Sequence, residues 1–475
     1  MPNKNTQNIF PKASKIHFVG VGGIGVSAVA RWLCQEDKTV SGSDVAVSDL
    51  TRSLADEGVL IFRGHDTSHI TKVMPDAVVA SLAIPDENPE VAAAKRAGIP
   101  VLKYPEALGA LANTYNLVAV SGTNGKSTTT AMIGLILLEA RQDPTILVGS
   151  IIKELESNFR KGASRTAVIE ACEYKRAFLA YQPNIAVITN IEPDHLDYYR
   201  SIEDIIDAFT HFALNIKSNG TLVINGDDQN AQRVLTTVQA KRPDIRIVTF
   251  GKKEGAEARI SGTRVKGEKT LFHLLFNNQE HGLQLNIPGE FNAYNAAAAF
   301  TVSMLLGADP KAATTVFAEF HGIWRRFERV GEFRACPVIS DYAHHPTAIE
   351  KTILAARSIF PKKRIVAVFE PHQHNRTRML FDDFVKSFDE ADVVICSEIY
   401  TVKGRITAED AKVSSADLIS SMKDRDGERG RSRELLFAKN LSETEVLIRK
   451  HIKANDCLLI VGAGDIGGLP LKLIS

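Results

Sequence analysis

The sequence has little charge imbalance and no long apolar run, and each absence excludes a class of protein. Its 57 Lys and Arg residues and 56 Asp and Glu residues leave a formal net charge of +1, so no general electrostatic attraction to nucleic acid or to a membrane surface is expected. No apolar run reaches the roughly 18–20 residues of a membrane span, and residues 1–15 lack the apolar core of a signal peptide. We therefore expect a cytoplasmic protein that binds neither nucleic acid nor a membrane.

Cysteine is also scarce. The five cysteines, at positions 34, 172, 336, 396 and 457, show no C-x-x-C spacing, which argues against a disulfide framework or a structural zinc site and for a reducing compartment. The apolar content of 44% and the charged content of 24% are ordinary for a globular protein. A length of 475 residues predicts about three domains, at roughly 150 residues for each.

The most informative segment is SGTNGKSTTT, at residues 121–130. The apolar run at 117–120 is typical of a buried parallel strand, and residues 128–140 are predicted to form a helix. Strand, glycine turn, Lys-Ser and helix are the layout of a phosphate-binding P-loop. Val120 departs from the G-x-x-x-x-G-K-S pattern, so the alternative is a helix N-terminus with Lys126 in solvent.

P-loop chemistry would place Lys126 on the β- and γ-phosphates of a nucleotide and the Ser127 hydroxyl on Mg2+. Gly122 and Gly125 would allow the backbone to turn its N–H groups toward an anion. The predicted nucleotide-binding residues of this segment are Gly122, Thr123, Asn124, Gly125, Lys126, Ser127 and Thr128.

A second strand–loop–helix unit occupies residues 15–44, and its loop GVGGIG at 20–25 fits G-x-G-x-x-G. With an acidic residue about 20 positions further on, here Asp44, this is the dinucleotide fingerprint and predicts NAD. A UDP-sugar also supplies a diphosphate for the helix N-terminus and a ribose for Asp44, and a tight turn without a ligand is the third alternative. The predicted ligand-binding residues here are Gly20, Gly22, Gly23, Gly25, Ser43, Asp44 and Ser81.

Two further strands, at 166–171 and 184–190, are predicted to end in the polar segments EACE and TNIEPDHLD. Ligands bind beyond the carboxyl ends of parallel strands, so we expect Glu170 and His195 on the same edge as Lys126. Together with Ser127 they would form a Mg2+–nucleotide site. Taken singly, Glu170 could be a hydrogen-bonded strand-end carboxylate and His195 a helix cap.

Residues 256–288 predict a β-meander, and a helix follows from about 289 to 306. Asn292 and Asn295 near its start suit either capping or hydrogen bonding to a flat base edge. Arg325 and Arg326 then offer charge to a reacting phosphate group, unless they belong to a solvated linker.

A third α/β domain is expected from about residue 328, with strands at 338–340, 365–369, 393–396, 435–438 and 457–461. The polar segments DYAHHP at 341–346 and EPHQHNRTR at 370–378 follow the first two strands, so this domain also presents polar groups to the nucleotide. The paired histidines suggest a metal, but no third ligand has a spacing that supports zinc.

In order and spacing, these segments resemble those of the Mur ligases of peptidoglycan synthesis over nearly the whole chain, and most of all the alanine-adding branch. The matching segments are GVGGIG with GSD, SGTNGKSTTT, NIEPDHLDYY, NAYNAAAA, GIWRRFE, DYAHHPTAI, and FEPHQHNRTR with LFDDF. Their combination is far more specific than any one motif.

The resemblance implies an α/β fold with three domains. These would be an N-terminal Rossmann-like UDP-substrate domain at 1–113, a central P-loop ATP-binding domain at 114–328 and a C-terminal Rossmann-like amino-acid-binding domain at 329–475. It also implies that ATP and Mg2+ are the cofactors and that the first glycine loop binds a UDP-sugar, not NAD.

The resemblance further implies roles for single residues. Asn292 and Asn295 would contact adenine, and Ser127, Glu170 and His195 would bind magnesium. The residues implied at the reacting phosphate and amino acid are Lys126, Arg326, Asp341, His344, His372 and Arg376.

The implied activity is ATP-dependent ligation of L-alanine to UDP-N-acetylmuramate through an acyl phosphate. A recycling branch adds L-alanyl-γ-D-glutamyl-meso-diaminopimelate to the same nucleotide, and residues 168–171 and 341–349 also resemble that branch. We favour L-alanine, because Arg376 suits a carboxylate clamp close to the reacting amine. A nicotinamide dehydrogenase would leave the P-loop without a function, and a nucleotide-regulated binding protein would not need the clustered Asp, His and Arg.

Several positions depart from the alanine-adding pattern. Asn124 stands where His is usual, Ser127 where Thr is usual, and Phe291 where His is usual. Cys172 and Ser340 each replace an acidic residue.

Overall fold

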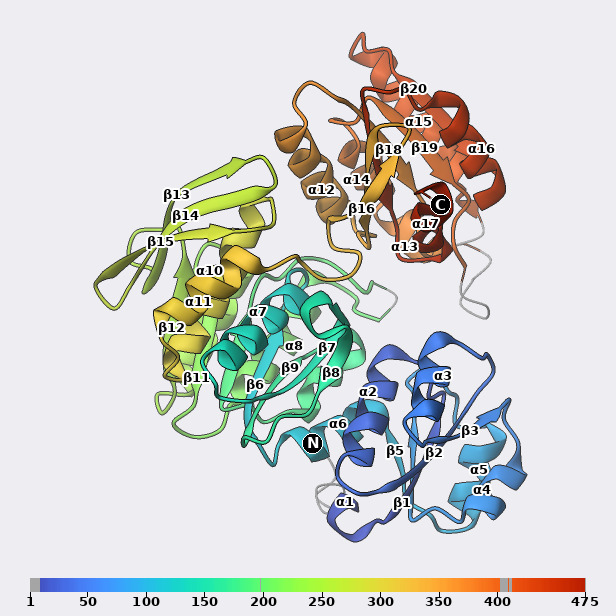
Figure 1. The fold of residues 1–475 in the computed structure, drawn as a ribbon, viewed down its shortest axis with the longest axis vertical. Helices are drawn as coiled ribbons and strands as arrows, with labels where there is room; N and C mark the ends of the chain where they lie inside the picture. Colours follow the sequence, from blue (N-terminus) through green and yellow to red (C-terminus); the bar gives the residue numbers. More distant parts are fainter. Residues whose placement is uncertain (1–8, 197, 402–408, 410–411, 475) are drawn as a thin grey trace.

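The computed structural model of the chain describes residues 9–196, 198–401, 409 and 412–474. They form three β-sheets that follow one another along the sequence (Figure 1). Helices lie between and around the strands of each sheet, which confirms the predicted α/β fold. The sheets change between residues 103 and 116 and between residues 285 and 328, while the domain boundaries at 113 and 328 remain predictions.

The first sheet has five parallel strands in the order β3-β2-β1-β4-β5. This order reverses between β1 and β4, and in doubly wound folds ligands bind at such a switch point. The strands are β1 (Lys15–Val19), β2 (Thr39–Asp44), β3 (Leu60–Arg63), β4 (Ala77–Ala80) and β5 (Val101–Lys103). The helices are α1 (Ile9–Lys12), α2 (Ile24–Cys34), α3 (Asp49–Asp56), α4 (Thr67–Val73), α5 (Pro89–Arg96) and α6 (Tyr104–Ala112).

The central sheet has ten strands in the order β15-β14-β13-β12-β11-β10-β6-β9-β7-β8. The strand before the P-loop, β6, lies between β10 and β9 and is buried, as its apolar sequence predicts. The strands are β6 (Asn116–Ser121), β7 (Thr145–Ile152), β8 (Ser157–Arg160), β9 (Thr166–Glu170), β10 (Ile185–Ile188), β11 (Thr221–Asn225), β12 (Arg246–Gly251), β13 (Ala258–Lys266), β14 (Lys269–Phe276) and β15 (Gln279–Leu285). The antiparallel pairs β13–β14 and β14–β15 confirm the predicted meander.

Five α-helices and two short 3-10 helices belong to this part of the described chain. They are α7 (Lys126–Glu139), η1 (Lys153–Leu155), η2 (Tyr174–Ala180), α8 (Ile202–Leu214), α9 (Gln229–Lys241), α10 (Glu290–Leu305) and α11 (Pro310–Glu319). Helix α7 begins two residues earlier than predicted, directly at Lys126.

The third sheet has six strands in the order β16-β17-β21-β18-β19-β20, and only β16 is antiparallel to its neighbour. The strands are β16 (Glu328–Phe333), β17 (Cys336–Asp341), β18 (Arg364–Phe369), β19 (Val393–Ser397), β20 (Glu434–Ala438) and β21 (Asp456–Val461). The helices are α12 (Pro346–Ile359), α13 (His374–Met379), α14 (Phe381–Ser387), α15 (Ser415–Glu428), α16 (Leu441–His451), η4 (Asp465–Gly468) and α17 (Leu469–Ile474).

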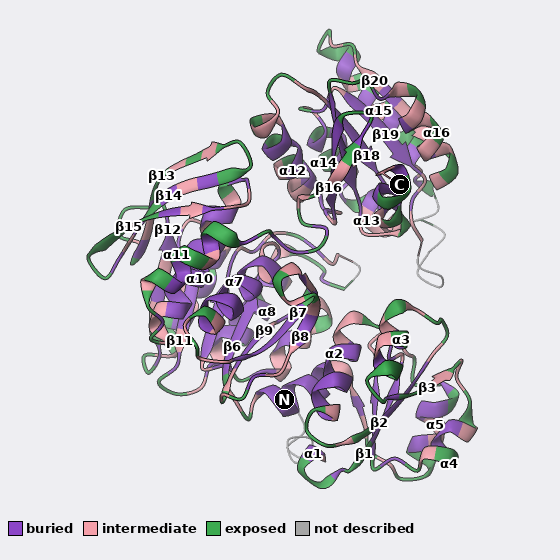
Figure 2. Ribbon diagram, viewed as in Figure 1, coloured by how far each residue is buried: buried purple, intermediate pink, exposed green. Residues whose placement is uncertain are grey.

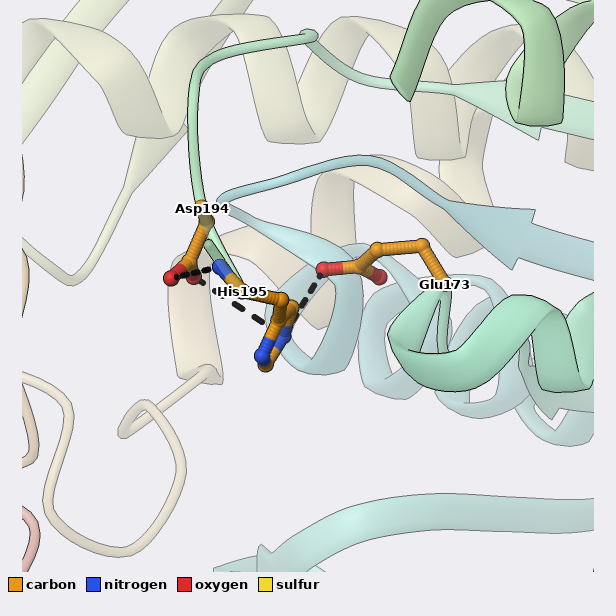
Figure 3. A group of neighbouring side chains, drawn as sticks. All are labelled: Glu173, Asp194 and His195. Atoms are coloured by element: carbon orange, nitrogen blue, oxygen red, sulfur yellow. Dashed lines mark hydrogen bonds and ion pairs between the residues drawn. The ribbon is translucent and has the colours of Figure 1, made fainter. Parts of the chain in front are cut away.

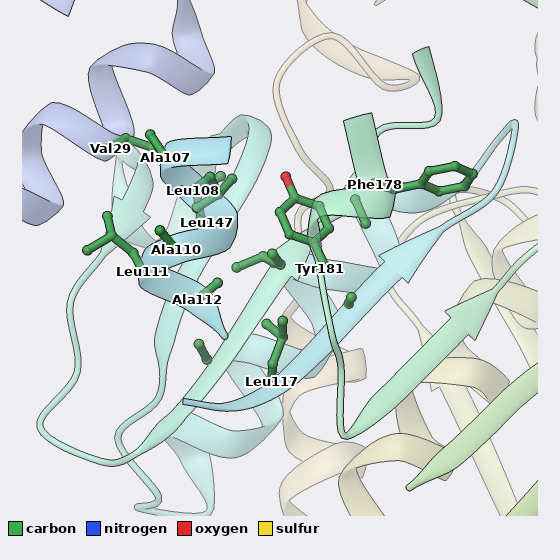
Figure 4. Close-up of a cluster of buried hydrophobic side chains, with 14 of the residues drawn as sticks. Val29, Ala107, Leu108, Ala110, Leu111, Ala112, Leu117, Leu147, Phe178 and Tyr181 are labelled. Atoms are coloured by element: carbon green, nitrogen blue, oxygen red, sulfur yellow. The ribbon is translucent and has the colours of Figure 1, made fainter. Parts of the chain in front are cut away.

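One apolar core runs from the first sheet into the central sheet (Figure 2). Helix α6 joins them: the labelled side chains from Ala107 to Ala112 lie near Leu147, Phe178 and Tyr181 (Figure 4). The buried Trp32 of α2 stacks on Phe159 of β8 at 5.8 Å. The first and second sheets therefore form a single packed unit.

The third sheet has its own cores, one on each face. Polar contacts link it to the central sheet. The His345 ring nitrogen Nε2 lies 2.7 Å from Pro193 O, Lys351 lies 3.4 Å from Glu192, and Arg376 pairs with Asp194 at 3.2 Å. The covalent connection includes the half-exposed Trp324. In the part of the chain that the structure describes, no helix combines the length and apolar character needed to cross a membrane.

Candidate active site

The loop between β6 and α7 has the backbone conformation of a phosphate-binding turn. Gly122 and Gly125 have φ values of +140° and +84°, which residues with side chains rarely adopt. A Cβ atom at Gly122 would collide with Thr189, and one at Gly125 with Asn295. Among the described residues, the N–H groups of positions 126–128 have no hydrogen-bond partner, so the first turn of α7 points unpaired donors at an anion site.

The Lys126 side chain lies back over this loop and is only 13% exposed, so the alternative of a lysine in solvent is wrong. Its Nζ donates to Glu173 at 3.0 Å and to the backbone oxygens of Thr123 and Gly122 at 3.1 and 2.5 Å. Burial acts to lower the pKa of Lys126, but the charge of Glu173 outweighs it and raises that pKa. The ammonium group therefore stays charged within reach of a phosphate.

Glu173, Asp194 and His195 form a compact cluster (Figure 3). Lys126 adjoins it through its ion pair with Glu173. One ligand atom from each of the three cluster residues lies within 4.8 Å of the others. His195 Nε2 is 3.5 Å from Glu173 Oε1 and 3.8 Å from Asp194 Oδ2. Burial lowers the pKa of His195, and the two carboxylates reverse this and raise it. The cluster thus gathers two acids and an imidazole at one sheet edge.

This cluster fits a divalent cation. The buried Glu173 Oε2 has no hydrogen-bond partner among the described residues, and an unsatisfied buried carboxylate oxygen is costly without a cation or donor. Oxygen ligands from carboxylates and a hydroxyl suit Mg2+. The buried Ser127 at the start of α7 can add its hydroxyl from the P-loop side.

Glu170 lies apart from this cluster. Its Oε2 accepts a hydrogen bond of 2.7 Å from the Gly149 N–H group on β7, which matches the alternative of a hydrogen-bonded strand-end carboxylate. Its charge still raises the pKa of Lys126. Ser201, not His195, caps α8, so the capping alternative for His195 is wrong. Sequence reasoning missed Glu173 and Asp194, although both lie in the segments EACE and NIEPDHLD.

A cavity of about 610 Å³ begins at the P-loop and extends between the central and third sheets. Residues 123–128 line one side, and Arg326, Asp341 and Thr352 line the other. Asn292 and Asn295 line it as well, with Asn292 Nδ2 donating to Pro288 O and Asn295 Nδ2 to Asn292 Oδ1. Gly289, without a side-chain cap, is the N-cap of α10, so the two asparagines do not cap this helix. The cavity has the size of a nucleotide site.

The two neighbouring arginines have different environments. Arg326 faces the cavity, with its guanidinium 5.4 Å from the Tyr342 ring centroid. Arg325 is buried, donates to Gly462 O, and lies 5.6 Å from the Trp324 ring. Arg326 can therefore reach a phosphate, whereas Arg325 links the connecting segment to the third sheet.

Asp341 and His344 follow β17. The Asp341 carboxylate accepts from the N–H groups of Phe327 and Ala343 at 2.8 and 2.7 Å, and burial raises its pKa, with Arg326 opposing. Burial, helped by Arg376, lowers the pKa of His344 well below its usual range. His344 is therefore neutral and can accept a hydrogen bond, although its lowered pKa makes it a weak base.

His372 and Arg376 follow β18 and face the central domain. Arg376 Nη2 is 3.2 Å from Asp194 Oδ1, and Nη1 is 3.3 Å from His372 Nδ1. The His344 and His372 rings are 5.9 Å apart. Burial raises the pKa of Asp194, and His195 and Arg376 more than offset this and lower it. The structure thus gathers His344, His372 and Arg376 near Asp194, whereas Asp341 faces the cavity.

The glycine loop of the first sheet lies at the switch point. Gly20 and Val21 donate to Ser43 O at 2.9 and 3.1 Å, and Gly22 donates to Asp44 Oδ2 at 2.8 Å. The Ser81 N–H group, at the end of β4, donates to Val19 O at 3.0 Å. The predicted residues therefore surround one loop, with Asp44 directly beside it.

The Ser43 side chain points the other way, into a buried polar network. Glu90 of α5 is fully buried, and its carboxylate accepts from Ser43 Oγ at 2.6 Å. His69, His65 and His17 lie 2.6, 2.8 and 3.3 Å from the same carboxylate. Sequence reasoning missed this network, because its members are scattered over four elements and one connecting loop.

The departures from the alanine-adding pattern have distinct surroundings. Asn124 Nδ2 donates to Glu192 at 3.2 Å, and Phe291 lines the cavity. Ser340 is buried within β17. Nothing in the structure explains why Cys172 replaces an acid.

Three family models match the chain in sequence. The Mur ligase family catalytic domain covers residues 15–116, the Mur ligase middle domain covers 120–303, and the Mur ligase glutamate ligase domain covers 325–464. The chain is 38% identical over 459 residues to the UDP-N-acetylmuramate–L-alanine ligase of Caldanaerobacter subterraneus subsp. tengcongensis, covering 96% of both chains. It is also 38% identical to the ligase of that name from Clostridium novyi, covering 95% of both.

Solved structures of the same fold extend this comparison. The UDP-N-acetylmuramate–alanine ligase of Thermotoga maritima superposes with a TM-score of 0.80 at 29% identity, covering 97% of this chain and 98% of that one. A murein peptide ligase from Psychrobacter arcticus superposes with a TM-score of 0.71 over the same shares, at 24% identity, which shows a shared fold.

Proposed function

Because the chain belongs to the Mur ligase family, we propose that it joins L-alanine to UDP-N-acetylmuramate with ATP, giving ADP and phosphate, in the synthesis of peptidoglycan precursors. The observation that carries this assignment is identity of 38% with L-alanine ligases over 96% of both chains. The enzyme is an ATP-dependent amide ligase.

The chemistry requires activation of the muramoyl carboxylate. An amine does not displace oxide from a carboxylate, so the γ-phosphoryl group of ATP is first transferred to give an acyl phosphate. The amine of L-alanine then attacks the acyl carbon, and the tetrahedral intermediate expels phosphate. Each step concentrates negative charge that preorganised cations can stabilise.

Residues on the two sides of the cavity have different roles in these steps. Lys126 and the first turn of α7 bind the phosphates of ATP, and Arg326 neutralises charge on the transferred group from the opposite wall. Asn292 and Asn295 bind the adenine end. The arrangement holds the reactants together between two domains and limits the access of water.

Glu173, Asp194 and His195, with Ser127, would hold Mg2+, which supplies charge neutralisation at the phosphoryl group when bound. Glu170 acts here through its charge on Lys126. The sequence predicted Glu170, His195 and Ser127 as the ligands. In the ligand set proposed here, Glu173 and Asp194 replace Glu170.

Arg376 clamps the carboxylate of L-alanine, with Asp341, His344 and His372 around the amine. In the structure Arg376 pairs with Asp194. The substrate carboxylate therefore has to replace Asp194 as the partner of Arg376. His344 is neutral, and its Nδ1 lies 2.9 Å from Tyr342 O, so its Nε2 can accept a hydrogen bond from the amine. The tripeptide-adding alternative is less favoured, because the named relatives at 38% identity add L-alanine.

The first domain binds UDP-N-acetylmuramate at Gly20, Gly22, Gly23, Gly25 and Asp44, with Ser43 and Ser81 shaping the loop. Its diphosphate lies at the N-terminus of α2 and its ribose beside Asp44. Because ATP and nucleotide sugars are cytoplasmic metabolites, we place the enzyme in the cytoplasm, without a nucleic-acid or membrane partner.

Phosphate release tests this function. With ATP, Mg2+ and UDP-N-acetylmuramate present, addition of L-alanine should give phosphate and UDP-N-acetylmuramoyl-L-alanine in equal amounts. Omission of any one component should stop both. The tripeptide at the same concentration should react more slowly, and faster turnover with the tripeptide would reverse the assignment of the acceptor.

A further inference from the structure

Tyr104 lies at the junction of the two nucleotide sites. It is the first residue of α6, directly after β5. Pro105 follows it, and Lys103 before it is held to Ile84 O at 3.0 Å and to Asp86 at 2.9 Å. The Tyr104 ring packs against the core shared by the first and central sheets. Its position is therefore fixed relative to both sheets.

The phenol covers the first turn of α2. A Cβ atom at Gly25 would lie 2.5 Å from Tyr104 Oη and 2.7 Å from its Cζ. In the G-x-G-x-x-G loop the third glycine usually permits close packing of helix and strand, but here it permits the close approach of a phenol. Only glycine at position 25 allows the hydroxyl to come this near to the helix backbone.

The first turn of α2, which this hydroxyl adjoins at Gly25, has unpaired donors. In the described part of the chain, the N–H groups of residues 24–26 have no hydrogen-bond partner, and neither does Tyr104 Oη. Gly23, the N-cap of α2, supplies no side-chain cap. The phenol and the helix N-terminus both carry hydrogen-bond donors without acceptors. Together these donors can bind an anion.

Two other features orient the site. Asn158 Nδ2 of β8 donates to Ile24 O at 2.8 Å, which ties the start of α2 to the central sheet. Burial, with the charges of Cys172 and Glu170, raises the pKa of Tyr104. The phenol therefore remains protonated and is a donor at all physiological pH values.

We propose that Tyr104 is a further substrate-binding residue, whose hydroxyl donates a hydrogen bond to the diphosphate of the UDP-sugar at the N-terminus of α2. The role rests on the proposed function of the first domain. It also places the donor on the side of the diphosphate that faces the central sheet, toward which the muramoyl carboxylate must extend.

Tyr104→Phe tests this assignment, since it removes the hydroxyl and keeps the ring that packs in the core. Loss of a hydrogen bond to a charged group should weaken binding of UDP-N-acetylmuramate and of UDP by about tenfold to a hundredfold in calorimetry. Binding of uridine, which has no phosphate, should be unchanged. In turnover, the KM for UDP-N-acetylmuramate should rise while kcat and the KM for ATP stay within about twofold.

Tyr115→Phe is the matched control, because its hydroxyl donates to Glu36 at 3.3 Å, away from the loop. It should bind UDP and uridine like the wild type. Unchanged UDP affinity in Tyr104→Phe, or an equal loss for UDP and uridine, would overturn the role of Tyr104 alone. Failure of the wild type to bind UDP-N-acetylmuramate would overturn the proposed function as well.

Discussion

At the scale of single residues, we expect Lys126 to be the group on which the proposed nucleotide site depends most. Lys126→Ala removes the cation that faces the phosphates and should lower kcat by at least about a hundredfold, because a charge-assisted contact contributes roughly 1.5–3 kcal/mol in binding and more in a transition state. Steady-state phosphate release measures the effect, and circular dichroism checks the fold. Lys95→Ala, which removes an exposed ion pair with Asp86 in the first domain, is the control. Near-normal turnover of Lys126→Ala would exclude this loop from catalysis.

The pair of carboxylates after β9 gives a second prediction. Glu173→Gln should raise the Mg2+ concentration needed for half-maximal activity by about tenfold or more, since loss of even a residue that only hydrogen-bonds to a metal ligand typically costs about 10- to 100-fold in metal affinity. Glu170→Gln should have the smaller effect, because Glu170 is bonded to Gly149 N instead. A magnesium titration of both variants compares them directly. A larger shift in Glu170→Gln would return the ligand role to Glu170.

This contrast shows how far residues can be predicted from sequence. Lys126, Ser127 and His195 lie beyond strand ends, as their motifs predict, and their roles remain predictions. Glu170 is the last residue of β9 and Glu173 follows it three positions later, and their different directions depend on the turn that leads into η2. Left-handed backbone at His195, with φ of 53°, likewise sets which way its ring points. The spacing of residues in the sequence does not predict such local turns.

At the scale of elements, the buried Glu90 network joins β1, β2, α4 and α5. Burial raises the pKa of Glu90, but hydrogen bonds from His17, Ser43, His69 and His65 lower it to about 2. A depressed folded pKa contributes stability above the unfolded value near 4.5, and that stability is lost as pH falls toward 2. This lowering of the Glu90 pKa corresponds to about 3 kcal/mol of folding stability at neutral pH.

Glu90→Gln should therefore lower the free energy of unfolding by about 2–4 kcal/mol at pH 7, with a smaller loss at pH 3. Urea denaturation at both pH values measures this. Glu87→Gln, in the exposed loop before α5, is the control and should have little effect. Equal losses for Glu90→Gln at pH 7 and pH 3 would contradict the charge-based account.

The elements themselves were predicted unevenly. Buried apolar strands such as β6, β10 and β18 and the meander β13–β15 follow from their sequence patterns. The strands β3, β7, β8, β12 and β16 were not predicted. β3 is an edge strand without a fully buried residue, and β7 is interrupted by the exposed Gly149. The edge strands β3, β8 and β16 have a neighbour on one side only and are incompletely buried, so their sequences carry little apolar signal.

At the scale of the whole molecule, the first and second sheets share a core, whereas the third has cores of its own and meets the central sheet through polar contacts and the packing of Leu196. We expect two calorimetric transitions, one for each unit. UDP-N-acetylmuramate at a hundred times its Kd should stabilise only the unit containing residues 9–323, by about 2.7 kcal/mol. L-alanine alone should leave that transition in place. One transition that shifts as a whole with the nucleotide would show that the third domain is coupled to the others.

The shared core around α6 also affects the nascent chain as it leaves the ribosome. Helix α6 ends at Ala112, but its apolar partners Phe178 and Tyr181 are translated only later. At about 5–20 residues per second, the roughly 70 intervening residues take about 3–14 s. During this interval the helix presents an apolar face that a chaperone can bind, and profiling of chaperone-bound ribosomes should show engagement that begins once α6 has emerged and ends after η2. We therefore expect the enzyme to need chaperones early in its synthesis, before the third domain has been translated.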